Sequence, residues 1–85
     1  MILEYKLDYR SSSLVYEKIF LNQLKEANLN GNIVRDGHEL KLFVEAQEAK
    51  ELEKFATNFA NALPHSIFLY DTKASMVEEM PSEPY

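Results

Sequence analysis

Residues 32–45 read NIVRDGHELKLFVE, and this stretch decides how the rest of the chain is organised. Its centre, Asp36-Gly37, is a strong signal for a two-residue hairpin, because both residue types accept positive φ. We therefore expect strands on either side, over residues 32–35 and 38–45. The second strand places three apolar side chains on one face, namely Leu40, Leu42 and Val44. Phe43 falls on the opposite face, which we therefore expect to be partly covered.

The segment before the hairpin reads as a strand followed by a helix. Residues 3–10 alternate between two sides, which predicts a strand with one buried face. Residues 15–27 then repeat apolar side chains at helical spacing, and Asn28, Asn30 and Gly31 end the helix because they tolerate the left-handed conformation. The two sides of the strand are Leu3, Tyr5, Leu7 and Tyr9, facing inward, and Glu4, Lys6, Asp8 and Arg10, facing outward.

The segment after the hairpin predicts a second helix, a last strand and a tail. The helix runs from about residue 47 to residue 63 and stops at Pro64. Residues 66–70, SIFLY, form a continuous apolar run that suits a strand. Residues 72–85 are acidic, contain two prolines and lack periodicity, so we expect a flexible tail or linker after a domain at 1–71. The apolar stripe of the helix is Ala49, Leu52, Phe55, Ala56, Phe59 and Ala60.

The element order is therefore β-α-β-β-α-β, with two helices that are each apolar on one side only. Right-handed crossovers bring both helices to the same face of a four-stranded antiparallel sheet. The expected fold is an α+β, ferredoxin-like two-layer sandwich. The sequence does not fix the strand order, but 4-1-3-2 is the usual order for this fold.

Composition narrows the possible functions. The chain has 85 residues, enough for one domain, and a net charge of −5, which argues against broad electrostatic binding to nucleic acid. It has no cysteine, which excludes disulfides, thiolate zinc sites and a cysteine nucleophile. No apolar run approaches the ~20 residues of a membrane span, and no secretory signal is evident. We expect a cytoplasmic protein without a membrane partner.

Few residues indicate chemistry. His38 and His65 lie in separate turns without metal-ligand spacing, and no carboxylate pair or phosphate-binding glycine loop is visible. We therefore expect no metal, no cofactor and no catalytic residue. RNA-recognition modules share the element order, but Phe43 lies between the acidic Glu39 and Glu45, so we do not expect nucleic acid as a partner.

Residues 9–17, YRSSSLVYE, offer one candidate anion site. The stretch leaves a strand and opens a helix, where unpaired N–H groups and the helix dipole favour negative charge. Arg10 and the hydroxyls of Ser11, Ser12 and Ser13 would add donors. The simpler interpretation is that one serine caps the helix and the others fill the turn. The residues favour this second interpretation and leave the first one open.

The spacing of these segments resembles the acylphosphatase domain, as in the N-terminal module of the hydrogenase-maturation carbamoyltransferase HypF. YRSSSLVYE matches the phosphate loop of that family, EANLNGNIVR the helix end, RDGHELKLFVEA the hairpin and strand, and ALPHSIFL the last connection. The resemblance covers about residues 3–70 and rests on spacing rather than identity. It implies the ferredoxin-like fold and a site for acyl or carbamoyl phosphate.

The same resemblance implies that the catalytic loop is degenerate. The arginine that binds phosphate in the family matches Glu17, a carboxylate that would repel phosphate. The asparagine that orients water falls near Arg35. The loop glycines match Tyr9, Ser13 and Val15, whose side chains restrict the backbone. Only Arg10 matches the motif, and Arg10 and Arg35 are the cations that could regroup around a phosphate.

Three hypotheses follow. The first is a degenerate acylphosphatase-like domain, the N-terminal part of a carbamoyltransferase for nickel–iron hydrogenase maturation, with little or no hydrolysis of its own; further domains of the same polypeptide or a protein partner would then be its partners. The second is a small stand-alone ferredoxin-like interaction module that binds through its sheet face or an edge strand. The third is a working acylphosphatase with rearranged residues.

Overall fold

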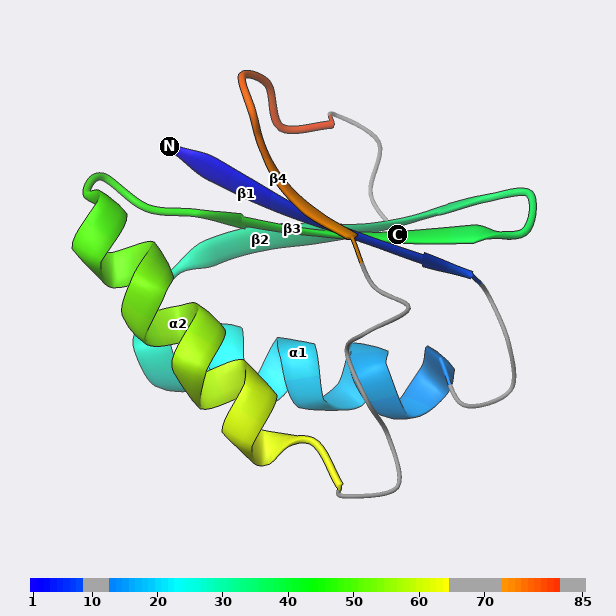
Figure 1. Cartoon of the computed structure of the whole chain (residues 1–85), viewed down its shortest axis with the longest axis horizontal. Helices are drawn as coiled ribbons and strands as arrows, with labels where there is room; N and C mark the ends of the chain where they lie inside the picture. Colours follow the sequence, from blue (N-terminus) through cyan, green and yellow to red (C-terminus); the bar gives the residue numbers. More distant parts are fainter. Residues whose placement is uncertain (9–12, 65–72, 82–85) are drawn as a thin grey trace.

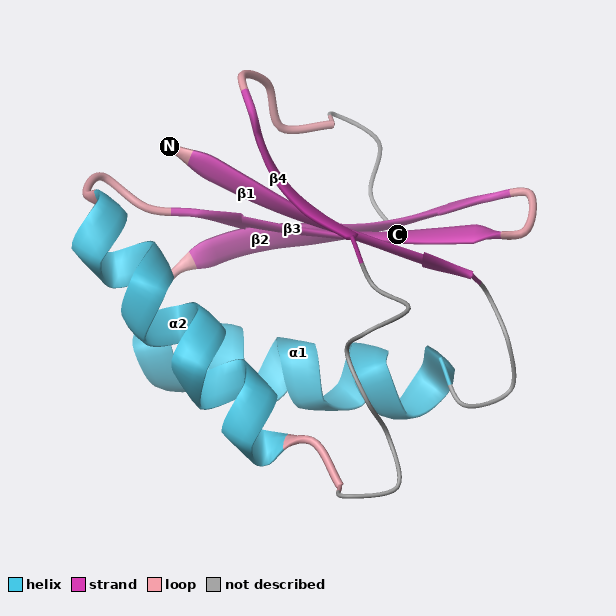
Figure 2. Ribbon diagram, viewed as in Figure 1, coloured by secondary structure: helices cyan, strands magenta, loops and turns pink. Residues whose placement is uncertain are grey.

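The computed structural model describes residues 1–8, 13–64 and 73–81 (Figure 1). Its strands form one sheet in the order β2-β3-β1-β4, with all neighbours antiparallel, and both helices cover one face of it (Figure 2). The predicted ferredoxin-like sandwich is confirmed, and the strand order is the usual one for the fold. The elements are β1 Ile2–Asp8, α1 Ser13–Ala27, β2 Asn30–Asp36, β3 Glu39–Glu45, α2 Ala49–Ala62 and β4 Lys73–Val77.

The hairpin between β2 and β3 lies where the sequence predicts it, but its loop is shifted by one residue. Asp36 pairs with Glu39, so the two loop residues are Gly37 and His38 rather than Asp36 and Gly37. Gly37 has φ +64°, whereas His38 keeps a negative φ. A two-residue turn with positive φ only at its first position needs glycine there, which is why the turn centres on Gly37.

The end of α1 follows the predicted asparagine signal. Asn28 has φ +56°, and its N–H donates to the carbonyl of Lys25. The N–H of Leu29 donates to the carbonyl of Leu24, which completes a Schellman motif. Leu29 packs against the core, so the cap also fixes the path of the chain into β2.

Gly31 lies between the Leu24 side chain of α1 and the backbone of β3 at Phe43. A Cβ at this position would lie 2.4 Å from the carbonyl oxygen of Phe43 and 2.6 Å from a methyl carbon of Leu24. The second distance shows that the Leu24 side chain packs directly on the Gly31 backbone. Glycine is therefore required here by close approach rather than by its backbone angles.

The core between the sheet and the helices is centred on aromatic rings. Phe20 of α1 meets Phe55 and Phe59 of α2 with ring centroids 5.4 and 5.5 Å apart, and Tyr5 of β1 meets Phe59 at 5.2 Å. All three phenylalanines are at most 1% exposed. Burial raises the pKa of the Tyr5 hydroxyl to about 12, because ionisation would place a charge in this apolar region.

The other face of the sheet is not simply polar. Ile2, Glu4 and Phe43 are buried there, so Glu4 lies on the predicted outward side of β1, but the expectation that this side is exposed is wrong at Glu4. Residues 78–81 follow β4 and pass above this face, on the side opposite the helices (Figure 1). The Asn32 amide of β2 donates to the carbonyl of Pro81 at 3.1 Å. The expectation that the face around Phe43 is partly covered is confirmed.

The fourth strand of the structure lies later in the chain than the sequence predicts. The predicted strand over residues 66–70 falls outside the described residues. The strand beside β1 is Lys73–Val77, within the stretch assigned to the tail, and it pairs from Lys6 opposite Lys73 to Ile2 opposite Val77. Four of its five side chains are exposed, so this edge strand is held by backbone pairing and leaves little hydrophobic pattern to detect.

Candidate functional site

The position of the expected phosphate site is marked by an ion pair between α1 and β2. Glu17 lies one turn into α1, on the flank that faces the edge of the sheet, and Arg35 is the penultimate residue of β2. The guanidinium Nη2 of Arg35 lies 3.1 Å from one carboxylate oxygen of Glu17 and 3.4 Å from the other. The Glu17 side chain is 6% exposed and that of Arg35 is 40% exposed.

Burial makes this pair different from an ordinary surface salt bridge. A buried carboxylate is stable only when a donor compensates for its lost hydration, and Arg35 supplies that donor. The cation is therefore directed at a protein carboxylate instead of an incoming anion. A phosphate placed beside Arg35 would also meet the negative charge of Glu17, so this arrangement disfavours anion binding.

The sequence-predicted anion ligands fall partly outside the described residues. Arg10, Ser11, Ser12 and the side chain of Ser13 are among them, and their role stays a prediction. Ser13 is the first residue of α1, which agrees with a helix that begins at the serines. Arg35 is described and meets Glu17. The sequence analysis identified Glu17 and Arg35 separately and did not predict their contact. Their opposite charges are the only signal in the sequence that they could pair.

A hollow on the outer side of α1 adjoins the ion pair. It has a volume of about 440 Å³, and Glu17 forms part of its wall. Leu14 and Leu21 are about half exposed, at 54% and 49%. Sequence reasoning missed this surface, because the apolar stripe that it predicts for the helix over residues 15–27 does not include Leu14 or Leu21. The hollow is lined by Leu14, Val15, Glu17, Lys18 and Leu21.

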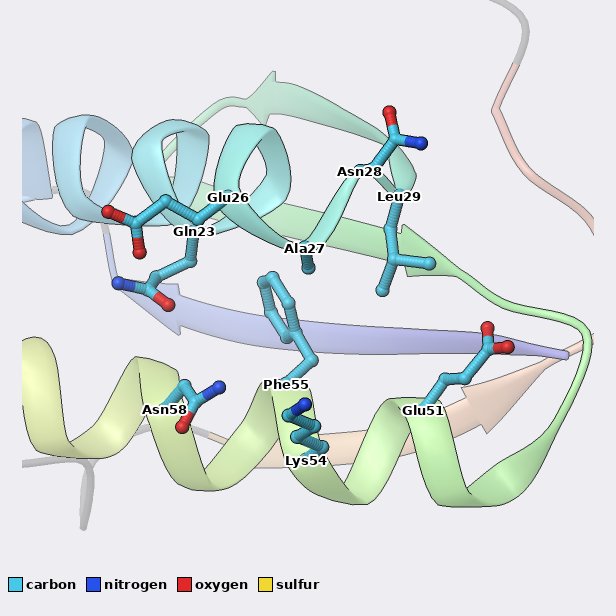
Figure 3. Close-up of a pocket in the computed structure, with 9 residues that line it drawn as sticks. All are labelled: Gln23, Glu26, Ala27, Asn28, Leu29, Glu51, Lys54, Phe55 and Asn58. Carbon is cyan, nitrogen blue, oxygen red and sulfur yellow. The ribbon is translucent and has the colours of Figure 1, made fainter.

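A larger groove lies between the helices (Figure 3). Gln23 of α1 and Phe55 of α2 project into it from opposite sides, with Glu51 and Lys54 near its rim (Figure 3). The groove has a volume of about 580 Å³, and its floor is Phe55, a core residue only 1% exposed. Its polar groups are mixed in charge and do not converge on one point, so we assign it no ligand. Its walls are Gln23, Glu26, Ala27, Asn28, Leu29, Glu51, Lys54, Phe55 and Asn58.

Other chemistry is sparse in the part of the chain that the structure describes. Within it, no group of three histidine, aspartate or glutamate side chains could hold a metal ion. His38 is exposed at the hairpin tip, and His65 lies outside the described residues. Neither α1 nor α2 is long and apolar enough to cross a membrane.

Comparison with known proteins assigns no family. No protein-family model matches the chain, and no curated protein matches it significantly. The functional argument therefore rests on the residues and their geometry.

Proposed function

We propose that this chain is an acylphosphatase-like domain in which an ion pair replaces the catalytic pair. It hydrolyses little or no acyl or carbamoyl phosphate and serves as a structural or docking module. The observation that carries the proposal is the contact between Glu17 and Arg35. Under the resemblance to acylphosphatases, these two residues stand where the phosphate-binding arginine and the water-orienting asparagine would be.

The geometry supports this interpretation in two ways. The chain has the ferredoxin-like sandwich that the resemblance implies. The two key positions also meet in space, as the members of a catalytic pair must, although they come from α1 and β2. At these positions the charges bind each other, so the architecture is kept while the anion-binding function is removed.

The chemical consequence follows from charge development during hydrolysis. Transfer of an acyl phosphate requires preorganised donors where negative charge gathers, and removal of one such donor costs about 10²-fold or more in rate. Glu17 removes a donor and adds repulsion. Efficient hydrolysis is therefore not expected of this arrangement.

A finer proposal places the domain in a longer protein. In that interpretation it is the N-terminal part of a carbamoyltransferase for nickel–iron hydrogenase maturation, and its partners are further domains of the same polypeptide. Only the spacing resemblance supports this step. Reading the gene beyond Tyr85 tests it, because zinc-binding cysteine clusters should then follow, whereas a stop codon contradicts it.

The principal test is hydrolysis of benzoyl phosphate and carbamoyl phosphate by the purified chain. We expect release of phosphate at the uncatalysed rate. Hydrolysis by the wild type that is lost in Arg10→Ala would overturn the proposal and favour a working acylphosphatase with rearranged residues.

A second test examines the ion pair directly. Glu17→Gln removes the carboxylate beside Arg35, so inorganic phosphate should raise the melting temperature of this variant and leave that of the wild type unchanged. Glu45→Gln is the matched control, because it removes the same charge from an exposed position at the end of β3. If inorganic phosphate changes the melting temperature of both variants equally, the Glu17 carboxylate does not prevent phosphate from binding beside Arg35.

A second candidate function is a small stand-alone interaction module. The sequence predicts binding through the sheet face or an edge strand, and residues 78–81 lie over part of that face. The half-exposed leucines of α1 favour the helix surface instead. Size-exclusion chromatography with light scattering separates binding of a second copy from binding of a different partner.

A further inference from the structure

The outward side of α1 combines exposed leucines with lysines. Four residues follow one another at spacings of four, three and four, so they lie along one side of the helix. We call this surface the Leu-Lys stripe. The two leucines are seven residues, or about 10 Å, apart along the helix axis. The stripe consists of Leu14, Lys18, Leu21 and Lys25, all of them exposed.

The two exposed leucines of the stripe form one continuous apolar surface. Leu14 and Leu21 border the same hollow, which has a volume of about 440 Å³. Val15, 37% exposed, extends it on one flank. The opposite side of the same helix already supplies the core through Tyr16, Phe20 and Leu24. The outer leucines are therefore not needed to hold α1 on the sheet.

The exposed charge of the stripe is positive, although the chain carries a net charge of −5. Lys18 and Lys25 are both exposed. Glu17 borders the hollow, but it is buried and paired with Arg35, so the pair adds no net charge to this surface. Glu26 lies on the other flank and lines the groove between the helices.

We propose that the Leu-Lys stripe docks an acidic amphipathic helix of a partner protein. Leucines spaced seven residues apart on the partner would fill the hollow beside Leu14 and Leu21, and its carboxylates would meet Lys18 and Lys25. The inference does not depend on the fate of acyl phosphate at the ion pair.

Charge selects this occupant over two others. A second copy docked antiparallel with Leu14 opposite Leu21 would place the two Lys18 side chains next to each other near the centre of the contact, which is unfavourable. An anionic membrane would extend beyond the stripe and repel the rest of a chain of net charge −5, whereas a single acidic helix contacts the stripe alone. An acidic helix satisfies both the apolar and the charged positions.

The test is an NMR titration of the isotopically labelled full chain with a synthetic acidic helical peptide that carries leucines seven residues apart. We expect chemical-shift changes confined to α1 around the stripe and weaker binding at high ionic strength. Two further probes are a peptide with every acidic residue replaced by lysine and vesicles containing phosphatidylglycerol. Neither should bind.

Variants make the test specific. Leu14→Ser with Leu21→Ser should weaken binding of the acidic peptide by about tenfold or more. Lys18→Glu with Lys25→Glu should weaken it similarly without touching the apolar contact. Met76→Ser is the matched control, because Met76 is 56% exposed on β4, away from the stripe. It should leave binding unchanged, and thermal unfolding checks that each variant is folded.

Several results would overturn the proposal. These are no binding of the acidic peptide, shifts spread over the sheet, equal binding of the lysine peptide, and retention of affinity in the charge-reversed variant. Binding to vesicles without binding to the peptide would assign the stripe to a membrane surface. A dimer that is lost in the leucine variant would assign it to a second copy. None of these outcomes depends on hydrolysis, so a failed docking test and a failed proposal for the ion pair remain distinguishable.

Discussion

The two faces of the sheet are stabilised by different means. On the helix side, Tyr5, Phe20 and Phe59 form one aromatic cluster with edge-to-face contacts. On the open side, cross-strand neighbours carry like charges, with Lys6 directly between Lys41 and Lys73. Such neighbours repel each other, so this face gains its order elsewhere.

The order of the open face comes from a segment distant in sequence. Phe43 and Glu4 face each other in register and are both buried, and residues 78–81 pass over this side of the sheet. The apolar repeat within a strand or helix therefore identifies the residues buried between the sheet and the helices. Burial on the open side depends instead on the path of the chain after β4.

The largest expected effect is on the helix side. Phe20→Ala removes a ring that is 0% exposed and contacts three other rings. We expect a loss of about 3–5 kcal/mol in the free energy of unfolding, because a cavity would remain between the helices and the sheet. Denaturant titration measures it. If Phe20→Ala lowers the free energy of unfolding less than Phe43→Ala does, the helix side of the sheet is not the more strongly stabilised face.

The next effect is at Gly31. Gly31→Ala forces a Cβ against the carbonyl of Phe43 and the side chain of Leu24. We expect a loss of about 3 kcal/mol, because backbone as well as side chain must move. Gly37→Ala is a useful comparison, since its Cβ would meet nothing and only the positive φ opposes it. Calorimetry of both variants should give a lower melting temperature for Gly31→Ala than for Gly37→Ala.

A smaller effect is expected on the open side. Phe43→Ala should destabilise the fold by about 2 kcal/mol, less than a buried aromatic usually costs, because the covering segment can settle into the vacated space. Faster hydrogen exchange at the amides of residues 78–81 should accompany it. Unchanged exchange there would mean that this segment does not depend on Phe43.

Tyr5 gives a pH-dependent effect. Its pKa is raised to about 12 in the folded chain from 10.0, so the unfolded chain loses the proton first as pH rises. The stability that the protonated hydroxyl provides is complete below pH 10 and is lost as pH rises toward 12. The wild type should therefore lose about 2 kcal/mol of its free energy of unfolding, relative to Tyr5→Phe, between neutral pH and pH 12. Denaturant titrations at a series of pH values measure this difference. If the free energy of unfolding falls equally with pH in both proteins, Tyr5 is not the cause of the alkaline loss.

The smallest effect is expected at Asn32. Asn32→Ala removes the hydrogen bond to the carbonyl of Pro81 and the one that Asn32 Oδ1 accepts from the N–H of Ile33, and should cost about 1 kcal/mol. Protease cleavage after β4 should also become faster, because the segment that follows β4 would open more often. Asn30→Ala, an exposed asparagine of the same strand, controls for the loss of an amide. Equal cleavage in both variants would show that Pro81 is held by other contacts.

Most of the fold could be predicted from local pattern. The Gly37 turn, the Asn28 cap and the apolar stripe of α2 each carry a local signal, and each lies within a residue or two of its predicted place. β4 could not be found this way, because an edge strand with exposed side chains depends on pairing with β1. The burial of Glu4 escaped prediction because it depends on contacts made by other parts of the chain.

The candidate site was less predictable than the fold. Glu17 and Arg35 were each identified by position, but their contact requires α1 to lie beside the edge of β2, which no spacing rule states. The Leu-Lys stripe was hidden for a different reason. Leu14 and Leu21 lie outside the apolar stripe that the sequence predicts for this helix, and only the structure shows that they are exposed together beside one hollow.

The tip of the hairpin has a practical consequence. Gly37 and His38 are exposed, and the chain contains no cysteine. A single cysteine introduced at His38 would therefore be a unique thiol for attaching a fluorophore or a surface tether. Such a probe would leave the buried aromatic rings untouched, so one labelled protein could serve both folding and docking measurements.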